Sequence, residues 1–306
     1  MQQAKPGLLV SLLVDHEFQK LQAEDAHAAA ARHGFDVEVA FADNSAILQI
    51  QQLYKVIHRP AAERVKAIVV ETVVGEGLER VARAAAQAGI GWILVNRRVG
   101  YLEELRAAHP ALPIATVGTD QIEIGRIQAR QFQVLMPAEP GVMLYVQGPA
   151  DTSAARERLA GVQQGLASSA IELRVLDGDW TEESGGRAVE RWLRLRSSGG
   201  VRPALVGCQN DTMAMGAKKA LEASKTRPAL ARLPLTGCDG LLEGGRRLVD
   251  LRQLAATVIT PSNTGPAIDL LARFLVTHQA PPAELQLPPA SYPAVDELAR
   301  RHAAKH

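Results

Sequence analysis

The sequence predicts an α/β protein of two doubly wound domains, each built on a parallel sheet. Short apolar runs alternate with helical patterns through most of the 306 residues, and this alternation indicates strands joined by crossover helices. The pattern starts again near Asp120, which gives two successive β-α-β-α halves. Aliphatic residues dominate and only 4% of residues are aromatic, as expected for sheets covered by helices on both faces.

In the first half, glycines and apolar spacing mark the elements. An alanine-rich helix is expected to end at Gly34 and a second helix at Gly89, because glycine commonly follows a helix C-terminus. Between them, apolar residues from Ile47 to Ile57 recur at helical spacing. The expected strands cover 8–14, 37–41, 65–70, 90–95 and 114–117, and the expected helices cover 19–33, 46–58 and 78–88.

The second half repeats this order after a proline-rich break at 137–141. The expected strands cover 142–146, 173–176, 204–206, 234–237 and 255–259, and the expected helices cover 122–135, 154–168, 185–197, 212–223 and 261–278. A proline-rich tail follows. No low-complexity linker separates the halves, which favours domains joined by several chain crossings over domains joined by one linker.

Charge and hydropathy exclude some classes of protein. The chain has 34 basic and 33 acidic residues, a formal net charge of +1, and no basic block, so a nucleic-acid partner is not expected. No apolar run is long enough to span a bilayer. The first residues enter the first strand without a leader pattern. Two interpretations stay open: a cytoplasmic protein, or a sequence that begins near the mature end of a secreted chain.

Polar residues that follow strands indicate a binding protein. In 206–221 and 235–240, an apolar run stops at a polar residue beside a small one, which is how parallel sheets present ligand-binding groups. No catalytic signature accompanies them: Gly75 and Gly77 lack the third glycine of a dinucleotide motif, and no phosphate loop or nucleophile elbow occurs. The sequence therefore predicts a receptor rather than an enzyme, with no cofactor and no catalytic residue.

Histidine and cysteine give no metal pattern. His16 lies between Asp15 and Glu17, but proximity on one loop does not make a metal or acid–base site. Cys208 and Cys238 follow strands that are expected to be neighbours. They are interpreted as two buried thiols, with a disulfide as the alternative.

Several motifs along the chain share their order and spacing with one known family. They lie at 66–70 with 88–90, at 116–120 with Gly125, at 152–158 with Gly161, at 209–216, at 237–240 and at 254–257. Together they resemble the type I periplasmic sugar-binding proteins, in particular the ribose-binding members. The family shares its fold with the effector domains of lac-repressor-like transcription factors.

The resemblance implies two lobes joined by a three-crossing hinge, the periplasmic binding protein-like I fold. The N-terminal ligand-binding lobe would contain 1–119 and 261–289, and the C-terminal lobe would contain 120–260 and 290–306. The ligand would lie between the lobes, and the hinge would close over it.

The resemblance also implies a function: a monomeric periplasmic receptor for a monosaccharide or related polar ligand, which it delivers to the membrane permease of an ABC-type transporter. A chemoreceptor partner stays open. The alternative is the effector domain of a transcriptional regulator. Such a protein needs a DNA-binding headpiece, and only a few residues precede Leu8, so no headpiece is expected in this chain.

For the C-terminal lobe, the resemblance assigns ligand contacts to Arg158, Asn210 and Asp239. A guanidinium can donate to two neighbouring hydroxyls, and a carboxylate can accept from two. The alternative for Arg158 is a solvated helix arginine like Arg156, and the alternative for Asn210 and Asp239 is ordinary turn chemistry. Asp211 is expected to cap the following helix or to brace the hinge.

Two aromatic residues are expected to face the sugar ring. Trp180 matches the aromatic position of the C-terminal lobe, with an exposed loop aromatic as the alternative, and Phe18 would lie opposite. Phe18 belongs to Val14-Asp-His-Glu-Phe18, where the family has Asn-Asn-Pro-Phe-Phe. Glu17 therefore replaces an aromatic residue and Asp15 an asparagine. Thr260 replaces a longer polar hinge residue.

The remaining N-terminal candidates are Glu71, Asn96 and Arg97. The family usually has Asp-Arg at positions 96 and 97, and its ribose-binding members have asparagine at position 71. With Asp15, Glu17 and Asp239, Glu71 makes the expected site acidic. Three explanations are open: a ligand that carries an amine, a polyol with many donors, or neutralisation of the acids by Arg97 and Arg158. The last needs the fewest assumptions, and the sequence does not identify the sugar.

Overall fold

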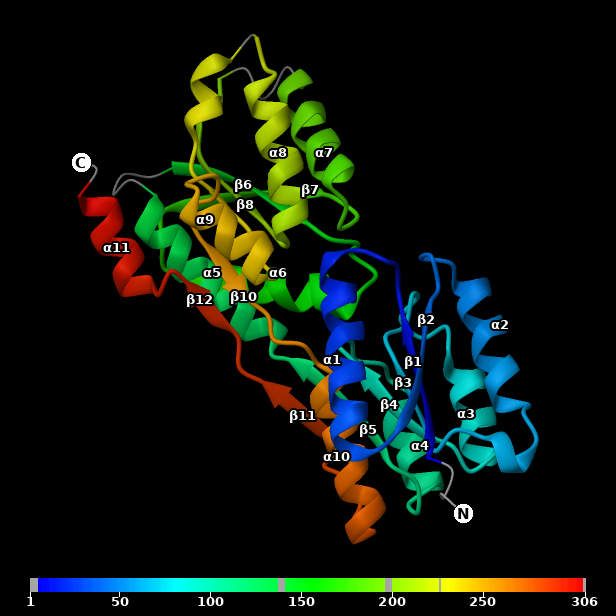
Figure 1. Cartoon of the computed structure of the whole chain (residues 1–306). Helices are drawn as coiled ribbons and strands as arrows, with labels where there is room; N and C mark the ends of the chain where they lie inside the picture. The colour runs from blue at the N-terminus through cyan, green and yellow to red at the C-terminus, as the bar shows by residue number, and fades with distance from the viewer. Residues whose placement is uncertain (1–4, 137–140, 196–199, 226, 305–306) are drawn as a thin grey trace. The chain divides into compact units, whose positions relative to one another are not determined.

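The computed structural model describes residues 5–136, 141–195, 200–225 and 227–304. The backbone forms two compact units. Unit 1 contains Met1–Thr119 and Ser262–Leu287, and unit 2 contains Asp120–Pro261 and Pro288–His306. The chain therefore passes three times from one unit to the other. Figure 1 labels the elements of each unit.

Unit 1 contains a six-stranded parallel sheet in the order β11-β5-β4-β3-β1-β2. The order reverses between β1 and β3, which is the switch point where doubly wound sheets bind ligands. The strands are β1 (Gly7–Leu12), β2 (Asp36–Phe41), β3 (Ala67–Val70), β4 (Gly91–Val95), β5 (Ile114–Thr119) and β11 (Glu284–Leu287).

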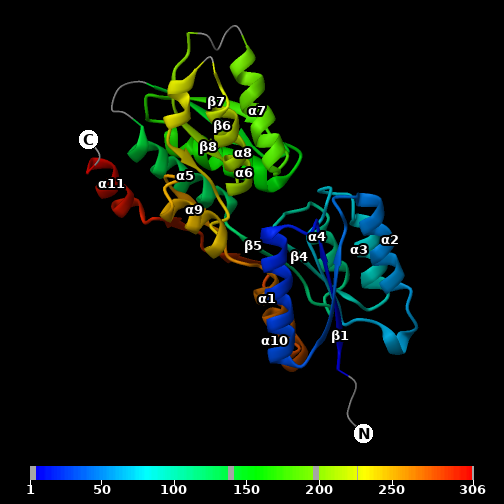
Figure 2. The same ribbon diagram turned by 45° about the horizontal axis from the view of Figure 1, so that its top comes forward.

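Helices cover both faces of this sheet, as Figures 1 and 2 show. One face packs against α1 (Glu17–His33) and α10 (Thr264–Thr277), and the other against α2 (Ala46–Ile57), α3 (Glu79–Gln87) and α4 (Leu102–Ala108). The alternation of β1 explains the two cores: Leu8 and Val10 join the first, and Leu9 joins the second.

Unit 2 contains a four-stranded parallel sheet in the order β7-β6-β8-β9, whose order reverses between β6 and β8. Past β9, Thr236 and Ala256 form an isolated parallel bridge. The strands of this sheet are β6 (Gly141–Gln147), β7 (Ile171–Asp177), β8 (Pro203–Cys208) and β9 (Leu235–Thr236). Two further strands, β10 (Thr257–Ile259) and β12 (Ala290–Tyr292), form a separate two-stranded sheet.

The helices of unit 2 again form two layers (Figure 1). One layer contains α7 (Glu182–Arg194) and α8 (Asp211–Glu222), and the other contains α5 (Gln121–Leu135), α6 (Ser153–Leu166) and α11 (Val295–Ala303). Short helical segments precede β9 at Pro228–Arg232 and follow it at Leu242–Arg246 and α9 (Arg247–Asp250). Side-chain caps begin several helices: Asp120 accepts from Glu123 N, and Thr152 accepts from Ala155 N.

The predicted fold class is confirmed, with corrections to individual elements. The connection before β5 contains the unpredicted helix α4, and the proline-rich tail contains β11, β12 and α11. The strand expected at 255–259 is not part of an all-parallel sheet, because β10 pairs antiparallel with β12. Positions 137–140 of the expected break and 196–197 of the expected helix lie outside the described residues.

In the described part of the chain, no helix combines the length and apolar character needed to cross a bilayer.

Two glycines allow α5 and α6 to pack backbone against backbone. A Cβ at Gly125 would lie 2.1 Å from the Arg158 carbonyl oxygen, and a Cβ at Gly161 would lie 2.1 Å from the Ile122 carbonyl oxygen. Neither distance is compatible with a side chain, so the position of α6 depends on these two residues.

We expect Gly161→Ala to lower the free energy of unfolding by about 1–3 kcal/mol, because the added methyl group forces the two helices apart. The higher helix propensity of alanine offsets less than this. Urea denaturation measures the change. In the matched control Gly100→Ala, the new Cβ would lie 3.7 Å from Glu76 Oε1, an ordinary contact. A Gly161→Ala variant as stable as that control would contradict the tight helix contact.

Candidate ligand-binding site

In both units, the candidate residues lie mainly beyond the carboxyl ends of the strands. In unit 2, Trp180 follows β7, Asn210 follows β8 and Asp239 follows β9. In unit 1, Glu71 follows β3 and Asn96 follows β4. Because the strands of each sheet are parallel, these ends share one edge, and the sequence prediction of ligand groups at that edge fits the observed topology.

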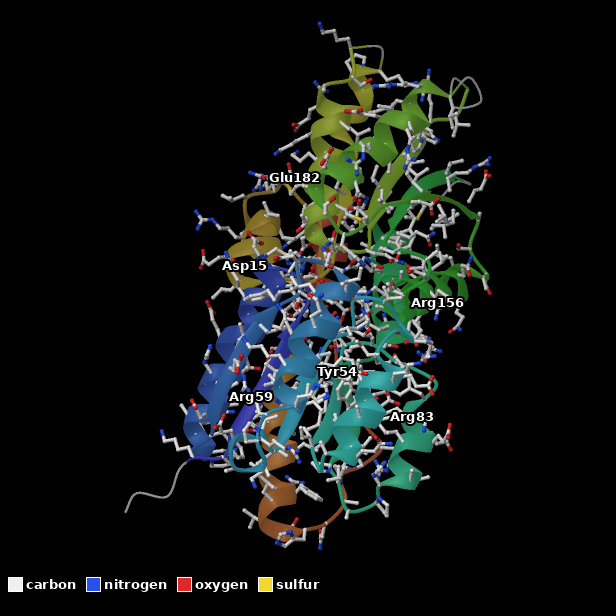
Figure 3. The ribbon with its side chains drawn as sticks, turned by 90° about the vertical axis from the view of Figure 1, so that its right-hand side faces the viewer. Asp15, Tyr54, Arg59, Arg83, Arg156 and Glu182 are labelled. Carbon is white, nitrogen blue, oxygen red and sulfur yellow. The ribbon has the colours of Figure 1, made fainter. Side chains whose placement is uncertain are left out.

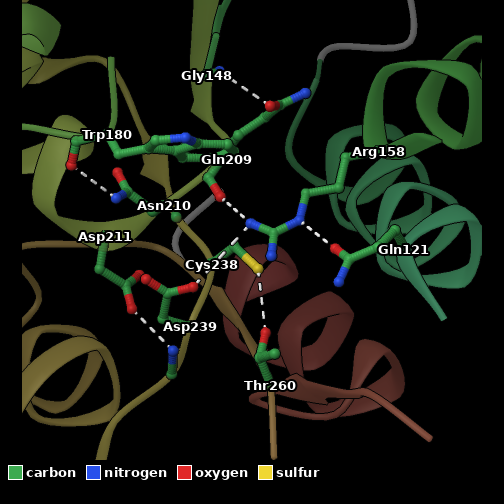
Figure 4. Close-up of polar contacts among 12 residues, drawn as sticks. Gln121, Gly148, Arg158, Trp180, Gln209, Asn210, Asp211, Cys238, Asp239 and Thr260 are labelled. Atoms are coloured by element: carbon green, nitrogen blue, oxygen red, sulfur yellow. Dashed lines mark hydrogen bonds and ion pairs between the residues drawn. The ribbon is translucent and has the colours of Figure 1, made fainter. Parts of the chain in front are cut away.

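Arg158 lies on α6 and is held in place by three elements of unit 2 (Figure 4). Its Nε donates to Gln121 Oε1 at 2.7 Å, and its Nη1 donates to the Gln209 carbonyl oxygen at 2.5 Å. The same Nη1 lies 4.0 Å from Asp239 Oδ1. The side chain is only 4% exposed, so the solvated-arginine alternative is wrong for Arg158. Exposed Arg156 instead donates to backbone carbonyls of the preceding loop.

One guanidinium nitrogen of Arg158 takes no part in these contacts. Nη2 forms no hydrogen bond with any residue that the structure describes. A buried cation can thus be fixed by two of its nitrogens and still offer donors to a ligand with the third.

The Trp180 indole is packed in a defined position. The Arg158 Cζ lies 5.6 Å from the ring centroid, a distance at which a cation interacts with an aromatic face. A Cβ at Gly148 would lie 2.2 Å from the ring, so the glycine after β6 makes room for the indole. The φ angle of Trp180 is +74°, unusual for a bulky residue. The ring is half-buried, so the exposed-aromatic alternative is wrong.

Asn210, rather than Asp211, caps α8. Asn210 Oδ1 accepts from Met213 N at 2.8 Å, and Asn210 Nδ2 donates to the Trp180 carbonyl oxygen at 2.8 Å. The capping role expected for Asp211 is therefore wrong. The Asp211 carboxylate instead accepts from Thr257 Oγ1 at 2.7 Å and from the Gly240 amide at 2.8 Å, which braces the turn that carries Asp239.

Asp239 lies on this turn with a φ angle of +102°. Its amide donates to the Val258 carbonyl oxygen, and its own carbonyl oxygen accepts from the Thr260 amide, both at 3.0 Å. The Asp239 side chain is 17% exposed. Thr260 is buried, and its Oγ1 lies 3.5 Å from Cys238 Sγ. The structure therefore places Thr260 behind Asp239 as a support.

Cys208 and Cys238 are both free and buried, as the thiol interpretation predicts. Burial raises the pKa of Cys238 to about 12 and raises the pKa of Cys208 as well. Both sulfurs are therefore protonated at neutral pH.

In unit 1, the Glu71 carboxylate is almost completely buried, at 1% exposure. Its Oε1 accepts from Asn96 Nδ2 and its Oε2 accepts from Gln19 Nε2, both at 2.9 Å. Arg97 Nε lies 3.7 Å from Glu71 Oε1. Arg97 Nη1 also donates to the carbonyl oxygens of Thr72 and Val73. The neutralisation that the sequence suggests is thus present for Glu71 through Arg97, as it is for Asp239 through Arg158.

Asn96 and Glu71 exchange the roles that the family resemblance assigns to their positions. The resemblance places a carboxylate at position 96 and an amide at position 71, and this chain has the amide at 96 and the carboxylate at 71. The two side chains are hydrogen-bonded to each other. Asn96 has a φ angle of +62°, a conformation that asparagine and aspartate tolerate.

The other three candidates of unit 1 lie at the start of α1. Asp15, labelled in Figure 3, is exposed and lies 3.7 Å from Lys20 Nζ, and Glu17 is exposed. Phe18 is 7% exposed. Most of its ring is therefore enclosed by protein.

Sequence reasoning missed the glutamines that orient these groups. Gln19 bridges Leu13 N and Glu71. Gln121 orients Arg158, and Gln209 accepts from the Gly148 amide while its Nε2 donates to the Ala155 carbonyl oxygen. All three are buried. In the sequence, only their positions at helix starts and strand ends mark these glutamines, and a glutamine at such a position commonly faces solvent.

Among the described residues, no group of three or more histidine, cysteine, aspartate or glutamate side chains could hold a metal ion.

Known proteins resemble this chain in sequence and fold. The family model described as "Periplasmic binding protein domain" matches residues 7–275. The chain is 25% identical over 252 residues to the galactofuranose-binding protein YtfQ of Escherichia coli (strain K12), a match that covers 81% of this chain and 75% of that protein. It is 25% identical over 253 residues to the ribose import binding protein RbsB of the same organism, with 82% and 77% covered. The crystal structure of a galactofuranose-binding protein has the same fold, with a TM-score of 0.81, 21% identity and 98% of this chain and 99% of that chain covered.

The exchange between positions 71 and 96 gives a double-mutant test. Asn96→Asp removes the amide donor and places a second carboxylate beside Glu71, so we expect it to lower the free energy of unfolding by about 1–3 kcal/mol at pH 7. In Asn96→Asp with Glu71→Asn, most of this loss should return, because one carboxylate again faces one amide. Urea denaturation of the four proteins measures the coupling. Additive losses in the double variant would show that the pair does not act as a unit.

Proposed function

Because this chain belongs to the periplasmic binding protein domain family, we propose that it is a solute-binding protein for a monosaccharide or closely related cyclic polyol. Units 1 and 2 serve as its two ligand-binding lobes. The protein binds its ligand without chemical change and delivers it, as a monomer in the periplasm, to the permease of an ABC-type importer. The binding proteins above are named for galactofuranose and ribose, which supports a sugar in furanose form as the first ligand to test.

The observation that carries this proposal is the group formed by Arg158, Trp180 and Asp239 in unit 2. It combines a guanidinium nitrogen available as donor, an aromatic face and a partly exposed carboxylate. A sugar ring offers the matching chemistry, with hydroxyls along its edge and C–H groups on its face. Glu71, Asn96 and Arg97 provide a second polar group in unit 1, with Asp15, Glu17 and Phe18 as further candidates on the loop before α1 and in its first turn.

The two arginine–carboxylate pairs favour a neutral ligand over an amine. Arg97 accompanies Glu71, and Arg158 accompanies Asp239. A carboxylate that already has a cationic partner gains less from a second cation than an unpaired one. Asn210 and Thr260 then act by holding Trp180 and Asp239 in place, with any direct ligand contact secondary.

The test of the function is a calorimetric panel of pentoses and hexoses that populate furanose forms, inositols and amino sugars. We expect saturable one-to-one binding of at least one neutral member, and recovery of the ligand unchanged. Binding stabilises the folded protein by about 2.7 kcal/mol when the ligand is at 100 times its dissociation constant, so thermal shift provides an independent readout. Chemical turnover of the bound compound, or preference for the amino sugars, would contradict the proposal.

For the ligand found in this way, we expect Arg158→Ala to weaken binding at least tenfold, since the ligand loses a charged donor and Asp239 loses its cationic partner. The matched control is Arg156→Ala, two residues away on the same helix, where the side chain is exposed. Its affinity should match that of the parent protein. Equal affinities of the parent protein, Arg158→Ala and Arg156→Ala would show that the ligand does not bind at α6.

Trp180 should report on binding through its fluorescence. Trp92 is fully buried in β4 and Trp192 is buried in α7, so a ligand at the strand ends of unit 2 should change mainly the environment of Trp180. We expect Trp180→Phe to lose most of the ligand-induced change while some affinity remains, because phenylalanine still provides an aromatic face. A full-amplitude response in Trp180→Phe would show that another residue forms the aromatic contact.

A further inference from the structure

Unit 2 contains a pocket whose lining does not include Arg158, Trp180 or Asp239, and we call it the basic pocket. Its volume is about 980 Å³, at the upper end of the range for small-molecule sites. The segment 231–235, which leads into β9, lines it, together with 249–250, 252–255 and the end of α11. These segments precede β9 and β10, whereas Asp239 and Thr260 follow them. The basic pocket and the candidate sugar site therefore lie at opposite ends of the strands.

The floor of the basic pocket is apolar. It contains Leu135, Leu235, Val249, Leu254 and Leu298. Three of these belong to the core between the sheet and α7 and α8, and the other two belong to the core beneath α5 and α6. These five side chains are 2–6% exposed, so the pocket reaches the outer edge of both cores, where an alkyl group could be removed from water.

The rim carries four permanently basic side chains and one acid. Lys218 lies 3.1 Å from Glu222 Oε1, and Arg301 pairs with Glu297. Arg232 and Arg252 also line the pocket, and neither has an ion pair with a residue that the structure describes. The single lining acid, Asp250, already accepts a hydrogen bond from Tyr292 at 2.8 Å.

The backbone at Arg252 provides an independent observation. Arg252 ends the turn after α9 with a φ angle of +60°, its amide donates to the Val249 carbonyl oxygen, and the Gln253 amide donates to the Leu248 carbonyl oxygen. Helices that end in this way normally have glycine at the left-handed position, because a side chain is strained there. An arginine at such a position, with its side chain on the rim of a cavity, indicates a use for the guanidinium.

We propose that the basic pocket binds a small amphipathic anion. Arg232 and Arg252 bind its phosphate or carboxylate head group, and the apolar floor accepts a short alkyl chain. Guanidinium groups recognise both kinds of head group through paired hydrogen bonds. Because the pocket and the candidate sugar site share no residue, occupancy of one does not require occupancy of the other.

The experiment is calorimetric titration of the full chain with octyl phosphate, and in parallel with octanoate, inorganic phosphate and octanol. We expect octyl phosphate or octanoate to bind one-to-one, and both inorganic phosphate and octanol to bind at least tenfold more weakly. Equal binding of octanol would overturn the role of the arginines, and equal binding of inorganic phosphate would overturn the role of the floor. Absence of saturable binding by both amphipathic anions would overturn the whole proposal.

Two variants separate side-chain function from folding. We expect Arg252→Gly to lose at least tenfold in affinity for the anion without a fall in melting temperature, because glycine relieves the strained φ angle. Arg232→Ala should show a similar loss. The control is Arg202→Ala, an exposed arginine before β8 that does not line the pocket. Unchanged anion affinity in the Arg232→Ala, Arg252→Gly double variant would overturn the proposal.

Discussion

The burial of the Arg158 guanidinium is the interaction on which the rest of the unit 2 site depends. A buried cation is stable only where carboxylates and carbonyl oxygens surround it. Gln121 comes from the helix beside α6, the Gln209 carbonyl follows β8, and Asp239 follows β9. The glycine contact between α5 and α6 sets the depth of the guanidinium, so the packing of small residues determines where the charge lies. Trp180 then rests against a cation that is already fixed.

Backbone strain is concentrated at the same strand ends. Among the described residues other than glycine, seven have positive φ angles, and three of these are Asn96, Trp180 and Asp239. Such conformations persist only where surrounding interactions hold them, and they often lie at functional sites. Each of the three is held here: the Asn96 side chain by Glu71, the Trp180 carbonyl by Asn210, and the Asp239 backbone by Val258 and Thr260.

The sequence predicts the regular helices and strands of this fold but little of its polar network. Long apolar runs and helical spacing predicted the sheets and the main helices, because burial on two faces imposes these patterns. Helix α4 has only seven residues, too few for a period to be recognised, and proline obscured β11 and β12 in the tail. That Asn210 caps α8 while Asp211 braces the turn at Gly240 could not be foreseen, since both residue types cap helices well and tertiary contacts decide between them. The buried glutamines were missed for a related reason: their partners are brought near only by the fold.

An acidic sequence around a site need not indicate a cationic ligand. Glu71 is surrounded by Gln19, Asn96 and Arg97, and Asp239 has Arg158 within 4.0 Å. Each of these two carboxylates therefore has a cationic partner before any ligand binds. The Asp239 carboxylate is still 17% exposed, so it can accept from a ligand hydroxyl more strongly than a neutral amide would. The exchange of acid and amide between positions 71 and 96 preserves this arrangement, because a hydrogen-bonded pair presents one charge and one amide whichever strand carries each. A neutral ligand with many hydroxyl groups requires a site whose charges are balanced and whose polar groups can still form hydrogen bonds.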